Sequence, residues 1–278
     1  MSVGVFLAVI GAAFLHALWN ALVKLGTAKL TGMLILTLVQ GGIGLIIATQ
    51  REQPAGQIWL WLIASGVFHT AYKLFLAHAY DRGDLSRVYP IARGAAPMIV
   101  LAVSAIVLDD RIGAWEFTGI LVLGMGILLM ARGVFRSGES RRLIPLALGS
   151  AMATAGYSLI DGLGARFAGD AVTYVAWLFV LDALFFTPTC LAIQGRGVLV
   201  APRQAWLLGS IAAMASYGAY AIAIWAMTQA PIALVTALRE TSILFAVLIG
   251  WLFFAERMDL GKSVAAVLIV AGVIFTRL

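Results

Sequence analysis

Ionisable and hydrogen-bonding side chains recur three or four residues apart inside otherwise apolar segments of this 278-residue chain. Residues at that spacing share one face of an α-helix, so the pattern predicts polar stripes on helices. Lys and Arg bind carboxylate and phosphate oxygens, and burial favours the protonated form of a carboxyl group. The chemistry indicated is binding of an anionic or zwitterionic solute, with a carboxyl group as candidate proton carrier. The stripes are His16, Asn20 and Lys24; His69, Tyr72 and Lys73; Tyr89 and Arg93; Tyr157 and Asp161; Tyr217 and Tyr220; and Thr236, Arg239 and Glu240.

Other kinds of site are not indicated by the sequence. The chain has three histidines, no His-Glu-x-x-His motif and a single cysteine, Cys190, so we expect neither a metal centre nor a disulfide. It also lacks a Gly-rich phosphate loop followed by Lys-Ser/Thr. A membrane-embedded enzyme would need a nucleophile with a base, or paired catalytic carboxylates, and neither has a convincing spacing here. We therefore expect no enzyme activity and no cofactor.

The composition requires a membrane environment for these stripes. Hydrophobic residues make up 62% of the chain and charged residues only 12%, which is too few to cover the surface of a soluble domain. The formal net charge of +6 is not arranged as a basic stripe with interleaved aromatic residues. We therefore interpret it as loop cations that face lipid headgroups, and we expect membrane lipid and no nucleic acid among the partners.

The apolar segments are long enough to be membrane helices. A bilayer core of roughly 30 Å requires about 20 apolar residues per helix. Short connections that contain Gly, Pro and charged residues separate the runs and leave no room for a soluble domain. The first run lacks a small-x-small cleavage site, so we expect it to be retained. The sequence predicts an all-α integral membrane protein with ten spans, at 3–25, 31–49, 57–79, 86–108, 114–132, 143–164, 171–193, 204–228, 231–254 and 260–276.

The two halves of the chain, 1–136 and 142–278, repeat one another. A shift of 146 residues places Arg93 on Arg239 and Gly126 on Gly272, and a shift of 138 residues aligns ALWNALVKLG (17–26) with AGYSLIDGLG (155–164). Each half contains five predicted spans, an odd number, so the second half enters the membrane from the opposite side. Inverted repeats of this kind build two gates around one central cavity.

Several motifs resemble one transporter family over nearly the whole chain. They are HALWNALVK (16–24), AYDRGDLSRVYPIARGAAP (79–97), DDR (109–111) and the long segment from WAMTQAP to FFAER (225–257). These motifs and the two five-span halves resemble the EamA branch of the drug/metabolite transporter superfamily, and more narrowly a subgroup of phosphonate-utilisation-associated membrane proteins. One departure is Asp110, where the family usually has Glu. The motifs are specific for the fold and weak for the substrate.

The resemblance implies a ten-helix transporter in the cell membrane, expected to be a bacterial inner membrane. It also implies a cavity lined by the first, third, fourth, sixth, eighth and ninth spans, which are the spans that carry the polar stripes. We expect a secondary transporter that exports or exchanges a small anionic or zwitterionic metabolite by alternating access. Amino acids and phosphonates are examples, and protons are a candidate coupling ion.

The candidate residues divide into two groups. A Lys or Arg at the centre of a span costs about 2.5–3.5 kcal/mol on insertion scales, so buried cations need partners or water. We expect Lys24, Asp161, Asp182 and Glu240 to form ion pairs or to carry a coupling ion. We expect the substrate to meet His16, Trp19, Asn20, His69, Tyr72, Lys73, Tyr89, Arg93, Tyr157, Tyr217, Tyr220 and Arg239.

Several alternatives stay open at this point. Arg239 with Glu240, or Arg93 with a facing aspartate, can be a buried ion pair that only fixes helix register, and Lys24 can extend to the headgroups. A lipid flippase or scramblase, or a multidrug or organic-cation exporter, would use the same fold. We expect a monomer, with a dimer as the alternative. The count of loop Lys and Arg places both termini outside the cell, whereas the family usually has both in the cytoplasm.

Overall fold

The structure is a computed structural model that describes residues 1–24, 29–80, 85–108, 110–131, 143–253 and 260–278. The described residues form helices and connecting turns, with no β-strand among them. The side chains of Lys24, Tyr89 and Arg93 lie outside the description, although their backbones belong to helices. The helices are α1 (Val3–Lys24), α2 (Lys29–Ala48), α3 (Ile58–Tyr80), α4 (Leu85–Val107), α5 (Ala114–Ala131), α6 (Leu143–Ala168), α7 (Ala171–Gln194), η2 (Arg196–Leu199), α8 (Arg203–Met227), α9 (Ile232–Arg239), α10 (Ser242–Phe253) and α11 (Leu260–Phe275).

The prediction of an all-helical membrane protein is confirmed in its coarse form. Among the described residues, six helical segments are long and apolar enough to cross a membrane. They are Val3–Val23, Leu30–Ala48, Ile58–Leu76, Ala171–Gln194, Arg203–Met227 and Ile232–Phe253. Three shorter apolar helical stretches lie at Ala95–Val107, Ala114–Leu129 and Ser263–Phe275. The chain is therefore a multi-pass membrane protein, and the number of ten spans stays a prediction.

The contacts divide the chain into two compact units, each built from parts of both sequence halves. Unit 1 comprises Met1–Thr70 and Ile160–Gln229, and unit 2 comprises Ala71–Leu159 and Ala230–Leu278. The long helices α3 and α6 each contribute one part to either unit. The predicted repeat boundaries at 136 and 142 lie outside the described residues, so the repeat limits stay a prediction.

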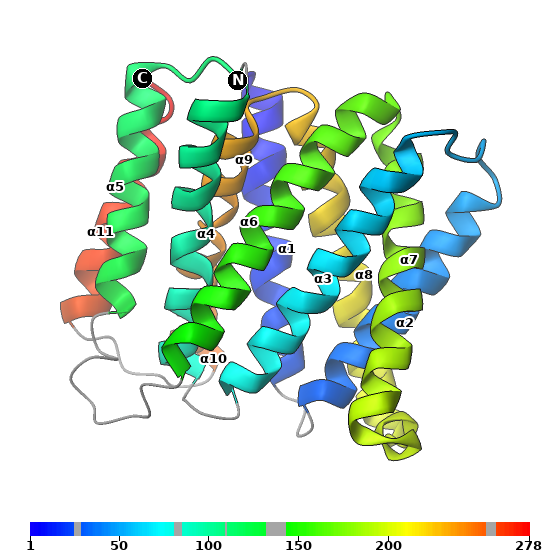
Figure 1. Cartoon of the computed structure of the whole chain (residues 1–278). Coiled ribbons are helices and arrows are strands. Elements are labelled where there is room, and N and C mark those ends of the chain that lie inside the picture. The colour runs from blue at the N-terminus through cyan, green and yellow to red at the C-terminus, as the bar shows by residue number, and fades with distance from the viewer. Residues whose placement is uncertain (25–28, 81–84, 109, 132–142, 254–259) are drawn as a thin grey trace. The chain divides into compact units, whose positions relative to one another are not determined.

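In unit 1, α1 packs against α8, and α2 packs against both α7 and α8 (Figure 1). The first part of α3 approaches α7 through small and aromatic residues. Gly66 is in direct contact with the ring of Phe185, and the indole rings of Trp59 and Trp177 meet edge to face with centroids 5.0 Å apart. These contacts fix the height of α3 relative to α7 within the unit.

In unit 2, α5 and α11 run side by side, and α4 packs against α5 and α9 (Figure 1). A Cβ at Gly119 would lie 2.6 Å from the carbonyl oxygen of Gly272, and a Cβ at Gly272 would lie 2.7 Å from that of Gly119. Only glycine permits this approach of two backbones, which is a common device for helix packing in lipid. Gly126 approaches α11 at Ala265 in the same way.

The last part of unit 2 differs from the predicted continuous span at 231–254. The helix is interrupted at Glu240 and Thr241, between α9 and α10. There the Glu240 N–H donates to the Ala237 carbonyl (3.0 Å) and the Thr241 N–H to the Leu238 carbonyl (3.1 Å), which are i to i−3 bonds. The Thr241 hydroxyl also donates to the Leu238 carbonyl (2.7 Å). A Thr side chain that competes for backbone carbonyls in this way loosens the α-helical ladder.

Candidate functional site

A buried carboxylate with three hydrogen-bond donors forms the densest polar cluster of unit 1. The Asp161 side chain on α6 has no exposed surface. The Tyr174 hydroxyl of α7 donates to Asp161 Oδ1 at 3.2 Å, and the Tyr220 hydroxyl of α8 donates to Oδ2. His69 of α3 places Nε2 at 3.1 Å from Oδ2. We name this set, His69, Asp161, Tyr174 and Tyr220, the Asp161 cluster, and it joins four helices.

The neighbouring helices hold the donors of the Asp161 cluster in place. Gly164 lies one turn after Asp161, and a Cβ there would come within 2.7 Å of Tyr174 Cζ, so glycine at this position makes room for the tyrosine ring. The end of α6 is tied to the end of α8 because Arg166 Nε donates to the carbonyl of Met227 at 2.7 Å. Tyr174 and Tyr220 therefore approach the same carboxylate from two packed helices.

Aromatic rings close one side of the cluster. The Tyr220 ring lies edge to face with the His69 imidazole, with centroids 5.3 Å apart, and edge to face with Phe179 at 5.8 Å. Phe179 in turn contacts the ring of Tyr217 at 4.8 Å. An ionised carboxylate in such an apolar setting is expensive unless it is well hydrogen-bonded. The three donors meet that requirement, and the arrangement can hold or release a proton.

A smaller polar group lies on α1 in unit 1. His16 is buried, its Nδ1 accepts a hydrogen bond from Trp19 Nε1 at 3.1 Å, and the two rings meet edge to face at 5.1 Å. Asn20 donates to the carbonyl of His16 at 2.7 Å. Asp182 on α7 is also buried within this unit. The structure thus groups the predicted residues of α1 with one another.

Unit 2 contains the buried cations that the sequence predicts. Lys73 is 7% exposed and Arg239 is 5% exposed, and Glu240, at the interruption between α9 and α10, is 2% exposed. Tyr72 and Tyr157 form an edge-to-face pair with centroids 5.6 Å apart. The side chains of Tyr89 and Arg93 of this unit, and that of Lys24 of unit 1, lie outside the described residues. The predicted pairing of Arg93 with Arg239 around a substrate therefore stays a prediction.

Two features escaped the sequence interpretation. The first is Tyr174, which was not among the candidates because it stands apart from any polar stripe, although Asp170 and Thr173 mark the start of its helix.

The second feature is a row of hydroxyl groups on α6. Ser150, Thr154 and Ser158 form this row, and their side chains are buried and have no hydrogen-bond partner in the part of the chain described. Their spacing of four residues was the signal that could have found them.

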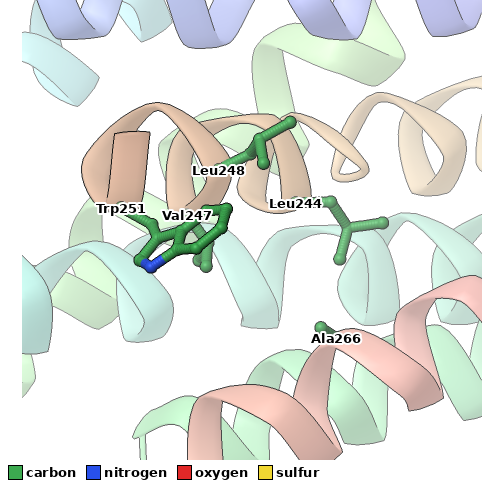
Figure 2. Close-up of a pocket in the computed structure, with 5 residues that line it drawn as sticks. All are labelled: Leu244, Val247, Leu248, Trp251 and Ala266. Carbon is green, nitrogen blue, oxygen red and sulfur yellow. The ribbon is translucent and has the colours of Figure 1, made fainter. Parts of the chain in front are cut away.

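A groove between α10 and α11 has a volume of about 360 Å³. Leu244, Val247, Leu248 and Trp251 of α10 and Ala266 of α11 line it (Figure 2). Trp251 and Leu248 are half exposed, as expected of side chains that face lipid. With an entirely apolar lining, this groove offers no group that would orient a charged solute. The described residues also contain no group of His, Cys, Asp and Glu that could hold a metal ion.

Comparison with known proteins identifies the fold and the family. A crystal structure described only as "Crystal structure of protein" has a TM-score of 0.76 with this chain, at 16% sequence identity, and the match covers 99% of this chain and 98% of the other. This likeness shows that the fold is shared. No curated protein sequence matches the chain. The sequence profile of the EamA-like transporter family matches twice, at residues 2–132 and 141–278. The chain therefore belongs to the EamA-like transporter family, and its transporter domain is duplicated.

Proposed function

We propose that the protein is a secondary transporter that exports or exchanges a small anionic or zwitterionic metabolite by alternating access. The observation that carries the proposal is the sign of the buried charge in unit 2. Among the described residues of that unit, the buried charged side chains are Lys73, Arg239 and Glu240, two cations and one carboxylate. Charged side chains at membrane depth are costly and mark substrate pathways. An excess of cations suits a carboxylate, phosphate or phosphonate group.

The interruption beside Arg239 adds a second argument for an anion. Transporters place the N-terminus of a half-helix at the anionic group of a substrate, because the positive end of the helix dipole and free N–H groups lie there. Here α10 begins at Ser242, directly after the interruption. Ser242 and Thr236 are buried, and their hydroxyls have no hydrogen-bond partner in the described structure. These hydroxyls are available to bind oxygen atoms of a solute.

An organic-cation exporter is the second candidate, because Asp161 is surrounded by aromatic rings. A quaternary ammonium group favours aromatic faces and a carboxylate. The Asp161 carboxylate, however, is completely buried and already accepts three hydrogen bonds. A cation would have to displace donors from three helices, so the anion proposal needs less rearrangement. A lipid flippase is the remaining alternative, and it would use the apolar groove between α10 and α11.

A thermal-shift screen of the purified protein tests the proposal. The probes are L-glutamate, L-threonine, 2-aminoethylphosphonate and glycerol 3-phosphate, with choline and tetraphenylphosphonium as cations. A ligand that binds only the folded state at about 100 times its Kd adds about 2.7 kcal/mol of apparent stability. We expect an anionic or zwitterionic probe to raise the melting temperature and to be transported by proteoliposomes. Shifts with the cations alone, or lipid movement without solute transport, would support the two alternatives instead.

Variants of Arg239 separate substrate binding from a structural ion pair. Arg239→Gln removes the charge, and we expect it to abolish the shift caused by the anionic probe. Arg239→Lys keeps the charge without the bidentate geometry, so it should retain part of the shift. A variant that melts at a lower temperature but keeps the full ligand-induced shift would assign Arg239 to the structural ion pair.

A further inference from the structure

The Asp161 carboxylate has no Lys or Arg partner within the described structure. Its hydrogen-bond partners there are His69, Tyr174 and Tyr220, and none is Lys or Arg. Arg166, on the same helix, directs its Nε to the carbonyl of Met227. A carboxylate buried in hydrocarbon without Lys or Arg is stabilised by hydrogen bonds or by taking up a proton. The site therefore combines two groups that can hold a proton, the Asp161 carboxyl group and the His69 imidazole.

The hydrogen positions in the cluster restrict where an added proton can go. When Asp161 is ionised, both tyrosine hydroxyls and the His69 Nε2–H point at its two oxygens, because a carboxylate only accepts hydrogen bonds. A proton added to the carboxyl group creates a new O–H donor, and one of the three neighbours must then stop donating. A proton added to His69 Nδ1 instead leaves the contacts in place and makes an imidazolium–carboxylate pair. In both cases the pair gains one proton, and no other reactant is needed.

The groups that contact Asp161 come from three other helices. His69 faces it from α3, Tyr174 from α7 and Tyr220 from α8. The other buried carboxyl group of unit 1 in the described part of the chain is Asp182, two helical turns after Tyr174 on α7. Ser65, one turn before His69 on α3, is fully buried, and its hydroxyl has no hydrogen-bond partner in the described structure. The unpartnered hydroxyl extends the polar face of α3 beyond His69.

We propose that the His69–Asp161 pair is the binding site for the proton that drives transport. The pair is treated as one site, because His69 Nε2 lies 3.1 Å from Asp161 Oδ2 and one added proton can reside on either group. Loss of the proton restores a carboxylate that holds α3, α7 and α8 to α6. Uptake of the proton at the carboxyl group weakens one of these attachments, which links protonation to helix movement. This proposal rests on the proposed transport function, so its tests are arranged to separate the two.

Proton binding itself can be measured without a solute. We expect an infrared pH titration of the protein in lipid vesicles to show a carboxyl C=O band that grows at low pH, or an imidazolium band when His69 takes the proton. The contribution of Asp161 to the carboxyl band should be absent from Asp161→Asn, and the imidazolium band should be absent from His69→Gln. Asp170→Asn, at an exposed helix cap, is the control: it should remove only the contribution of Asp170 itself and keep that of the His69–Asp161 pair. A titration that is unchanged in Asp161→Asn would overturn the proposal.

Coupling is measured in proteoliposomes with the probe that binds in the thermal-shift screen. With a gradient of about one pH unit and one proton per solute, the wild-type protein can build a solute gradient of about tenfold. We expect Asp161→Asn and His69→Gln to build none, with a solute ratio near one, and we expect Asp161→Asn still to exchange labelled for unlabelled probe. Exchange needs no net proton movement, and its persistence would show that Asp161→Asn is folded.

The remaining outcomes decide between the two proposals. Proton-driven accumulation that survives in both variants, or that is lost only in Asp182→Asn, would overturn the assignment to His69 and Asp161. Wild-type protein that exchanges a probe but never accumulates it would also overturn the coupling role. Wild-type protein that neither exchanges nor accumulates any probe would contradict the proposed transport function, and the infrared titration would still decide the proton site.

Discussion

At the scale of single residues, the arrangement around Asp161 depends as much on a missing side chain as on the polar groups present. The Tyr174 ring occupies the space where a Cβ of residue 164 would lie. Because residue 164 is glycine, the Tyr174 hydroxyl can reach Asp161. His69, Asp161 and Tyr220 could each be selected from the sequence because each has a polar neighbour at helical spacing. That they share one carboxylate could not be predicted, because spacing within one helix says nothing about which faces of different helices meet.

Gly164→Ala should therefore disturb the Asp161 cluster. The added methyl group would overlap the Tyr174 ring, and overpacking of this kind costs about 1–3 kcal/mol. We expect a lower melting temperature, and we expect Tyr174→Phe, which removes the hydroxyl in closest contact, to offset part of the loss in the double variant. Thermal unfolding of the two single variants and the double variant in one detergent measures the coupling. Strictly additive losses would contradict the contact.

At the scale of helices, the turn between α6 and α7 contains a charge-dependent cap. Gly169, directly before Asp170, adopts φ 73°, a left-handed conformation that favours glycine. The Asp170 carboxylate accepts hydrogen bonds from the Val172 N–H (2.9 Å) and the Thr173 hydroxyl (2.7 Å), and it lies 3.3 Å from Arg51. Burial opposes ionisation, but these hydrogen bonds and the positive charge of Arg51 outweigh it. The pKa of Asp170 is lowered from 3.8.

This cap predicts a loss of stability in acid. Because the pKa of Asp170 is lower in the folded state, its contribution is complete above pH 3.8 and disappears as the pH falls through the folded pKa. Asp170→Ala should lower the stability at pH 7 by about 0.5–2 kcal/mol, the usual cost of a lost N-cap. Asp170→Asn can still cap the helix, so it should lose less at pH 7 and become less sensitive to acid. Melting temperatures between pH 7 and pH 3 measure both effects, and an Asn variant with the acid sensitivity of the wild type would contradict the assignment.

The helices themselves were largely predictable, because long apolar runs bounded by Gly, Pro and charged residues define membrane spans. The interruption at Glu240 and Thr241 was not. The segment from Ile232 to Phe253 is apolar almost throughout. Hydropathy does not detect that the Thr241 hydroxyl donates a hydrogen bond to the Leu238 carbonyl. Likewise, the shift of 146 residues aligned Gly126 with Gly272, but the glycine that meets Gly272 across the contact of α5 with α11 is Gly119. Such contacts depend on the rotation of each helix, which repeat alignment does not determine.

At the scale of the whole molecule, the sequence repeat and the compact units follow different divisions of the chain. The family profile matches each half of the sequence once, whereas each unit combines helices from both halves. The pairs α2 with α7, α4 with α9 and α5 with α11 occupy corresponding positions in the predicted repeats, and each pair is in contact within one unit. This intertwining is the expected result of two repeats related by an axis in the membrane plane. Repeated motifs predict the symmetry, but only packing shows which helices form each unit.

The topology has a consequence that can be tested at the two termini. The predicted ten spans, an even number, would place the N- and C-termini on the same side of the membrane. The single cysteine, Cys190, is buried and should not react with a membrane-impermeant maleimide, and Cys190→Ala gives a cysteine-free background. In that background we expect Ser2→Cys and Leu278→Cys to be labelled from the same side of oriented vesicles. The labelled side would decide between the orientation indicated by the loop cations and the one usual for the family. Labelling from opposite sides would require an odd number of crossings and would contradict the pair of inverted five-span repeats.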